Sequence, residues 1–125
     1  MVFRILHIDD DSDIREIVAL SLSLDPALMV RSCAYGADAL ATAAEWAPDL
    51  ILCDVMMPGM DGPTTFRKMQ LNPEIAGIPV LLLTAKVQGV DQRRFAGLGV
   101  AGVLFKPFDP LTLAAQISDA LGWKD

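Results

Sequence analysis

Five short apolar segments recur along the chain, and a longer segment with helical periodicity follows each of them. Within the short segments, the apolar residues are mostly continuous rather than alternating with polar ones. Continuous apolar runs of this length are typical of parallel strands that helices cover on both faces. We therefore predict five strands, at Phe3–Ile8, Met29–Cys33, Leu50–Cys53, Val80–Thr84 and Gly102–Phe105.

The longer segments carry apolar residues at the spacing of one helix face. The predicted stripes consist of Ile14, Ile17, Val18 and Leu22, then Leu40, Ala43, Ala44 and Ala47, and finally Leu113, Ala114, Ile117, Ala120 and Leu121. Proline and glycine limit these helices, because proline suits a first helical turn and glycine commonly follows a last one. The predicted helices run from Ser12 to Leu24, through Leu40 to Ala47 before Pro48, from Pro63 to just before Asn72, from Val90 to Leu98, and from Pro110 to Leu121 before Gly122.

This alternation predicts an α/β fold of (βα)5 type, with a doubly wound, five-stranded parallel sheet. Right-handed crossovers leave few topologies, and the flavodoxin-like strand order 2-1-3-4-5 is the usual one. The length of 125 residues, with 53% hydrophobic residues, suits one globular domain over residues 1–125. Since a domain of this size needs no disulfide, we expect Cys33 and Cys53 to be free thiols in a reducing cytoplasm.

Polar side chains stand where the predicted strands end. In a doubly wound sheet, ligands bind beyond the carboxyl ends of the strands, at the point where the strand order reverses. The residues at these ends are Asp9, Asp10 and Asp11 after the first strand, Asp54 after the third, Thr84 at the end of the fourth and Lys106 after the fifth. The sequence therefore predicts a single site along this edge of the sheet.

The predicted site holds more negative than positive charge. Neighbouring strands lie about 5 Å apart, so Asp9, Asp10 and Asp54 must crowd together. Two like charges near 4 Å repel by about 4 kcal/mol at an effective dielectric constant of about 20. With Lys106 as the single cation, either one carboxylate is protonated or a divalent cation lies among the three. Ligands that are all oxygen favour a hard ion, and two carboxylates with a carbonyl and waters suit Mg²⁺.

A Mg²⁺ ion, a lysine and a threonine hydroxyl around a carboxylate can neutralise and orient a phosphoryl group. The carboxylate is then a competent nucleophile for that group. Asp54 is the candidate nucleophile because it stands alone at the end of the central strand, whereas Asp9 and Asp10 are paired like metal ligands. The loop that follows, residues 56–62, is rich in turn-forming residues and can bend a backbone carbonyl toward the metal.

Four segments, in order and over the whole chain, closely resemble the receiver domain of two-component response regulators. They are Ile5–Asp11, Asp49–Gly62, Leu83–Ala85 and Phe105–Phe108. The resemblance implies that Asp54 accepts a phosphoryl group from a phosphohistidine. It also implies that Asp10, Asp54 and the backbone carbonyl of Met56 bind Mg²⁺, and that Asp9 acts mainly through water. Lys106 would pair with the carboxylate and later with the phosphate, and Thr84 would donate a hydrogen bond to the phosphoryl oxygen. Pro107 matches the position of the family's usual cis proline.

The same resemblance implies a signalling module in a phosphorelay, not a turnover enzyme. Its phosphoryl donor would be a histidine kinase or a histidine phosphotransfer protein, and its target a downstream effector protein or an output domain. The fourth helix, fifth strand and fifth helix would form the output face, which is also a candidate homodimer contact. Val103 stands where receivers commonly carry an aromatic switch residue, three positions before the lysine. Met56 and Lys86 border the expected path of water, which predicts slow loss of the phosphoryl group.

Two other functions compete with this one. A Mg²⁺-dependent aspartyl-phosphate phosphatase of haloacid-dehalogenase type would need a second aspartate two residues after its nucleophile, where this chain has Met56. A flavodoxin-like nucleotide or flavin binder would need a glycine- or hydroxyl-rich loop after the first strand. The run from Asp9 to Asp11 would instead repel a phosphate there.

Charge and hydropathy limit the partners. The net charge of −6 argues against direct binding to nucleic acid or to an anionic membrane. No apolar run approaches the roughly 18 residues of a membrane span. The N-terminal segment becomes acidic at Asp9, before a signal-peptide core could form, so we expect a cytoplasmic protein.

Several conspicuous residues are assigned structural roles. Asp11 or Ser12 is expected to cap the first helix. His7 is expected to be packed within its strand, and Cys53 to face away from Asp54 because side chains alternate along a strand. We expect the methionines of the loop, Met56, Met57 and Met60, to pack within it, and Trp46 and Trp123 to cover edges of the core.

Overall fold

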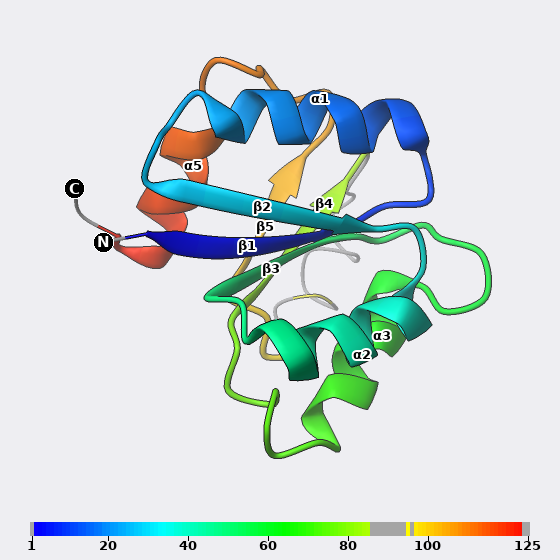
Figure 1. Ribbon diagram of the computed structural model, residues 1–125. Helices are drawn as coiled ribbons and strands as arrows, with labels where there is room; N and C mark the ends of the chain where they lie inside the picture. Colours follow the sequence, from blue (N-terminus) through cyan, green and yellow to red (C-terminus); the bar gives the residue numbers. More distant parts are fainter. Residues whose placement is uncertain (1, 86–94, 96, 124–125) are drawn as a thin grey trace.

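The computed structural model describes residues 2–85, 95 and 97–123 as an alternation of strands and helices (Figure 1). The elements are β1 (Phe3–Ile8), α1 (Ser12–Ser23), β2 (Leu28–Cys33), α2 (Gly36–Trp46), β3 (Leu50–Asp54), α3 (Gly62–Gln70), β4 (Val80–Thr84), β5 (Gly102–Phe105) and α5 (Leu113–Leu121). All five predicted strands are confirmed, each to within one residue. The predicted helix from Val90 to Leu98 falls largely on residues 86–94 and 96, outside the described part of the chain.

The strands form one parallel sheet in the order β2-β1-β3-β4-β5, which confirms the predicted topology. Helices α1 and α5 lie on one face of the sheet, and α2 and α3 lie on the other (Figure 1). Strands β3 and β4 are buried at every residue, as expected for central strands that helices cover on both faces. This arrangement places the carboxyl ends of β1 and β3 side by side.

Two hydrophobic clusters hold the helices to the sheet. On one face, Ile5, Leu52 and Leu83 of the strands pack with side chains of α1 and α5. On the other face, Ile51 and Leu82 pack with α2, α3 and Phe95. Neighbouring residues of one strand therefore belong to opposite clusters, and the polar ends of the strands lie at the rim between them.

The buried stripe of α2 differs from the predicted one. The residues that face the core are Gly36, Ala39, Ala43 and Trp46, whereas Ala44 and Ala47 are exposed. The cause is the close packing of α2 on α3, since a Cβ on Gly36 would lie 2.3 Å from Oγ1 of Thr65. Gly36, which has no side chain, therefore faces α3, and the buried stripe is shifted relative to the one that periodicity alone indicates.

Three further expectations need correction. Ile17 of α1, assigned to the buried stripe, is 41% exposed, and Ala120 of α5 is also exposed. Helix α5 begins at Leu113 instead of Pro110, because Asp109 accepts hydrogen bonds from the backbone N–H groups of Leu111 and Thr112 and forms a turn there.

Within residues 2–85, 95 and 97–123, each helix is too short or too polar to cross a bilayer.

Candidate functional site

The predicted site residues come together at the carboxyl edge of the sheet. Ile8 pairs with Cys53, so Asp9 and Asp54 follow directly from adjacent positions on β1 and β3. Asp54 pairs with Leu83, which places Thr84 one residue further along β4. The backbone N–H of Lys106 donates to the carbonyl of Thr84 at 2.8 Å, so β5 delivers the lysine to the same edge.

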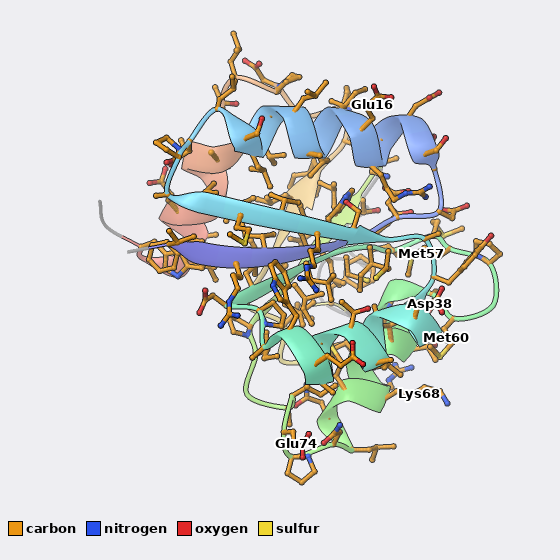
Figure 2. The ribbon with its side chains drawn as sticks, in the orientation of Figure 1. Glu16, Asp38, Met57, Met60, Lys68 and Glu74 are labelled. Atoms are coloured by element: carbon orange, nitrogen blue, oxygen red, sulfur yellow. The ribbon has the colours of Figure 1, made fainter. Side chains whose placement is uncertain are left out.

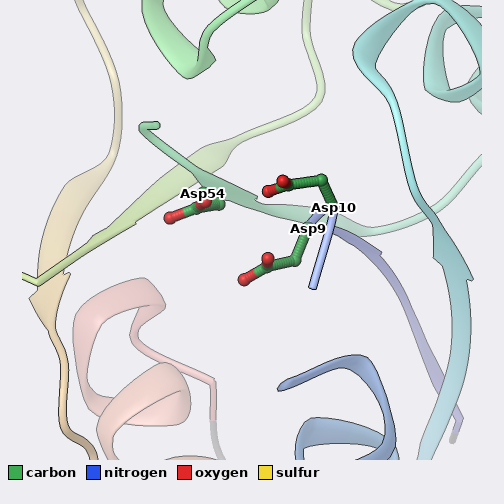
Figure 3. A group of neighbouring side chains, drawn as sticks. All are labelled: Asp9, Asp10 and Asp54. Atoms are coloured by element: carbon green, nitrogen blue, oxygen red, sulfur yellow. The ribbon is translucent and has the colours of Figure 1, made fainter. Parts of the chain in front are cut away.

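Asp9, Asp10 and Asp54 form an acidic cluster at this edge. Each offers a carboxylate oxygen, and these oxygens all lie within 4.8 Å of one another. Figure 3 shows the three side chains grouped at the ends of β1 and β3, with their carboxylates extending toward the same side. The side chains of Asp9 and Asp54 are only 1% and 8% exposed, whereas Asp10 is exposed to solvent. The cluster is therefore buried on one side and open on the other.

Lys106 joins two members of the acidic cluster. Its Nζ lies 2.9 Å from Oδ2 of Asp9 and 3.0 Å from Oδ1 of Asp54. Charge-assisted hydrogen bonds of this length are among the stronger ones in proteins. The peptide bond from Lys106 to Pro107 is cis, as the resemblance to receivers implied.

The electrostatics of the site follow from burial and from this shared lysine. Burial raises the pKa of Asp54, and the negative charge of Asp9 adds to the rise, while the hydrogen bond from Lys106 opposes it. Burial alone would lower the pKa of Lys106, but its hydrogen bonds to Asp9 and Asp54 outweigh that effect and the pKa is raised. Lys106 is therefore protonated at neutral pH, and it cannot balance three carboxylates.

The acidic cluster fits a divalent cation. Its carboxylate oxygens lie close enough together for the three residues to surround one ion, directly or through water. Hard cations with oxygen ligands, Mg²⁺ among them, match both this donor set and the excess negative charge. A Mg²⁺ site at this edge is also what the resemblance to receiver domains implied.

Arg15, which the sequence analysis did not select, also contacts the site. Its guanidinium Nη1 donates a hydrogen bond to the backbone carbonyl of Asp9 at 2.8 Å. Asp11 caps α1 as predicted, accepting hydrogen bonds from the backbone N–H groups of Asp13 and Ile14. The sequence could have indicated this contact, because Arg15 is a basic residue in the first turns of a helix that follows an acidic run.

Gly62 is a second residue that sequence reasoning missed. A Cβ at this position would lie 2.6 Å from the carbonyl oxygen of Asp54. The N–H of Gly62 donates to the carbonyl of Val55 at 2.9 Å, and Asp61 caps α3 by accepting from the N–H of Thr64. The loop after Asp54 therefore turns back sharply against the end of β3, and only glycine allows this approach.

The loop methionines do not behave alike. Met57 is buried in the cluster beneath α2 and α3, and Met60 lies on Gly36 at the start of α2 (Figure 2). The prediction that Met56 packs within the loop is wrong, because its side chain is 78% exposed beside the acidic cluster. Met56 directly follows Val55, whose side chain is buried at the point where the chain leaves β3.

The remaining conspicuous residues are structural, as expected. His7 is fully buried, and its burial lowers its pKa to about 4, so the ring is neutral near pH 7. Cys53 belongs to the cluster on the α2 side of the sheet, and burial raises the pKa of its thiol. Trp46 lies under the guanidinium of Arg31, and Trp123 stacks on Phe3.

Known proteins are similar to this chain in sequence and in fold. Residues 5–118 match the family of the response regulator receiver domain. The chain is 34% identical over 125 residues to the DNA-binding response regulator MtrA of Mycobacterium tuberculosis, covering 98% of this chain and 52% of that protein. It is 36% identical over 130 residues to the response regulator PleD of Caulobacter vibrioides, covering 99% of this chain and 27% of that protein. It therefore spans about half or less of the length of these relatives.

Solved structures agree with the sequence matches. The chemotaxis response regulator CheY4 of Vibrio cholerae superimposes with a TM-score of 0.87 at 30% identity, over 96% of this chain and 99% of that one. The receiver domain of a histidine kinase from Syntrophus aciditrophicus superimposes with a TM-score of 0.83 at 28% identity, over 97% and 91% of the two chains. The haloacid-dehalogenase alternative finds no support in these matches. The chain belongs to the receiver domain family of two-component response regulators.

Proposed function

We propose that residues 1–125 act as one receiver domain that accepts a phosphoryl group on Asp54 from a phosphohistidine. The observation that carries the proposal is the acidic cluster, with oxygens within 4.8 Å of one another and Lys106 bridging two of its members. Response regulators receive phosphate from histidine kinases and act on output domains. The donor here is a histidine kinase or a histidine phosphotransfer protein, and the module operates in the cytoplasm.

The transfer forms one bond and breaks another. An oxygen of the Asp54 carboxylate bonds to phosphorus, while the bond from phosphorus to the imidazole nitrogen of the donor breaks. The electron pair of that bond returns to the nitrogen, and an acyl phosphate remains on Asp54. Because the carboxylate and the phosphoryl group are both anionic, electrostatic stabilisation at the site governs the rate.

The residues around Asp54 have distinct parts in this step. Asp10 and Asp54, with the carbonyl of Met56, would hold Mg²⁺, and Asp9 would act through water. A bound Mg²⁺ supplies positive charge that offsets the repulsion between the phosphoryl group and the carboxylates. Lys106 holds Asp54 in place before transfer and pairs with the phosphate afterwards. The hydroxyl of Thr84, at the end of β4, donates to a phosphoryl oxygen.

The output is a change in protein contacts. The exposed surface of β5 and α5 would belong to the output face, which is also the candidate homodimer contact. Phe105 is 47% exposed there, whereas Val103 packs against the core on the α2 side of the sheet. The switch therefore acts without an aromatic side chain at position 103.

Acetyl phosphate tests this proposal without the natural donor. With Mg²⁺, mass spectrometry should show one added phosphoryl group on the wild type and none on Asp54→Asn, which keeps the shape but lacks the nucleophile. The matched control is Asp119→Asn, an exposed carboxylate on α5, which should be modified like the wild type. Modification of Asp54→Asn at the wild-type rate, or modification that persists in EDTA, would contradict the proposal.

A further inference from the structure

Arg15 holds a backbone carbonyl at the end of β1. The pairing of β1 with β2 and with β3 stops at Ile8 on both sides. The carbonyl of Asp9 lies one residue beyond, and it accepts a hydrogen bond of 2.8 Å from Nη1 of Arg15. Since a backbone carbonyl needs a hydrogen-bond partner, the Arg15 side chain supplies the donor that a neighbouring strand would otherwise supply.

This contact completes a set of bonds that fix the backbone on both sides of Asp10. The N–H of Asp9 donates to the carbonyl of Cys33 at 3.1 Å, and the N–H of Asp11 donates to Oδ1 of Asp9 at 3.0 Å. Within the described residues, the carboxylate of Asp10 makes no hydrogen bond or ion pair of its own. The direction in which the Cα–Cβ bond of Asp10 leaves the backbone is therefore set by the peptide groups beside it.

We propose that Arg15 is a positioning residue for Mg²⁺: by holding the Asp9 carbonyl, it aims the Asp10 carboxylate at the ion. The inference rests on the proposed function, because it assumes that Asp10 is a ligand. It adds a role for Arg15 that does not depend on contact with the phosphoryl group. The guanidinium is suited to this role because its planar donors hold an acceptor in a fixed direction.

The charge of Arg15 makes the proposal easy to test. If Arg15 influenced the site only as a positive charge, its removal would make the site more negative and Mg²⁺ would bind more tightly. If it orients Asp10, its removal would weaken binding despite that gain in negative charge. The two effects have opposite signs, so the direction of the change separates them.

The experiment measures Mg²⁺ binding by isothermal titration calorimetry and by the rise in melting temperature on addition of Mg²⁺. Arg15→Met keeps the length of the side chain and removes both donor and charge. Its binding should be weaker than wild type by about tenfold, the lower end of what loss of a ligand-orienting partner causes. The control is Arg67→Met, which makes the same charge change on the exposed side of α3.

The outcomes are distinguishable. Binding of Mg²⁺ by Arg15→Met as tightly as by Arg67→Met, or more tightly, overturns the inference while the proposed function stands. Failure of the wild type to bind Mg²⁺ overturns the proposed function itself. If Arg15→Met does not unfold cooperatively, Mg²⁺ binding is measured for Arg15→Lys instead, since this variant keeps the positive charge with a different donor geometry. Weaker binding by Arg15→Lys supports the inference, and unchanged binding overturns it.

Discussion

Replacement of Lys106 by methionine should strongly destabilise the metal-free protein. The Nζ of Lys106 lies 2.9 Å from Asp9 and 3.0 Å from Asp54, whose side chains are 1% and 8% exposed. Loss of one partner from a buried ion pair costs about 3–5 kcal/mol, because the remaining charge is left buried without compensation. Lys106 is itself 18% exposed, so we expect a loss near 3 kcal/mol, the lower end of that range.

Thermal unfolding in EDTA at pH 7, followed by circular dichroism, measures this loss. A change of about 3 kcal/mol corresponds to a melting temperature lower by about 10–15 °C in a domain of this size. The control is Lys68→Met, because Lys68 lies on the exposed side of α3 and loses the same charge (Figure 2). Its stability should stay within about 0.5 kcal/mol of wild type. Equal melting temperatures for the two variants would refute the argument that Lys106 compensates buried charge.

The pH dependence gives a second check on the same variant. Burial already raises the pKa of Asp54, and loss of the Lys106 hydrogen bond removes what opposes that rise. A carboxyl group whose pKa is raised by folding destabilises the fold at neutral pH, and protonation relieves this as the pH falls. The melting temperatures of Lys106→Met and wild type should therefore converge between pH 7 and pH 5. A gap that stays constant or widens would contradict this explanation.

Three other substitutions probe the site. Asp10→Asn should weaken Mg²⁺ binding, measured by calorimetry. Because Asp10 is exposed, the melting temperature of this variant in EDTA should stay close to that of wild type. A large loss of stability would show that Asp10 has a structural role. Gly62→Ala should destabilise by about 1–3 kcal/mol in urea unfolding because its Cβ would meet the carbonyl of Asp54 at 2.6 Å. Gly77→Ala, where a Cβ meets no atom within 4 Å, is the control, and equal effects of the two would count against this reason. Met56→Asn should speed hydrolysis of the acyl phosphate, because the exposed apolar side chain of Met56 would no longer obstruct the attacking water. Mass spectrometry after removal of acetyl phosphate measures this rate. An unchanged or slower rate would exclude the idea that Met56 obstructs water.

The sheet and the acidic cluster could be predicted because they depend on continuous patterns. Apolar runs such as Val80–Thr84 are buried on both faces, and this alone indicates central parallel strands. Once the strand order is known, the residues that follow β1 and β3 must be neighbours. The closeness of Asp9, Asp10 and Asp54 follows from that topology without further information.

Other features depend on contacts between segments that no local pattern records. The shift in the buried stripe of α2 follows from the contact of Gly36 with Thr65, and periodicity within α2 contains no information about α3. The need for glycine at position 62 arises from the carbonyl of Asp54, which approaches it only in the folded chain. Arg15 lies only six residues after Asp9 and was missed for a different reason, because its acceptor is a backbone atom and not a side chain. Tertiary geometry decides such positions.

The ion pair between Lys106 and Asp9 joins residues that are 97 positions apart in the chain. A ribosome adds about 5–20 residues per second, so the aspartates at the end of β1 are made roughly 5–20 s before their cation. Until β5 is in place, Asp9 and Asp54 lack the cation that pairs with them. Lys106 is therefore the last member of the site to be synthesised, and the site is complete only once β5 has joined the sheet beside β4.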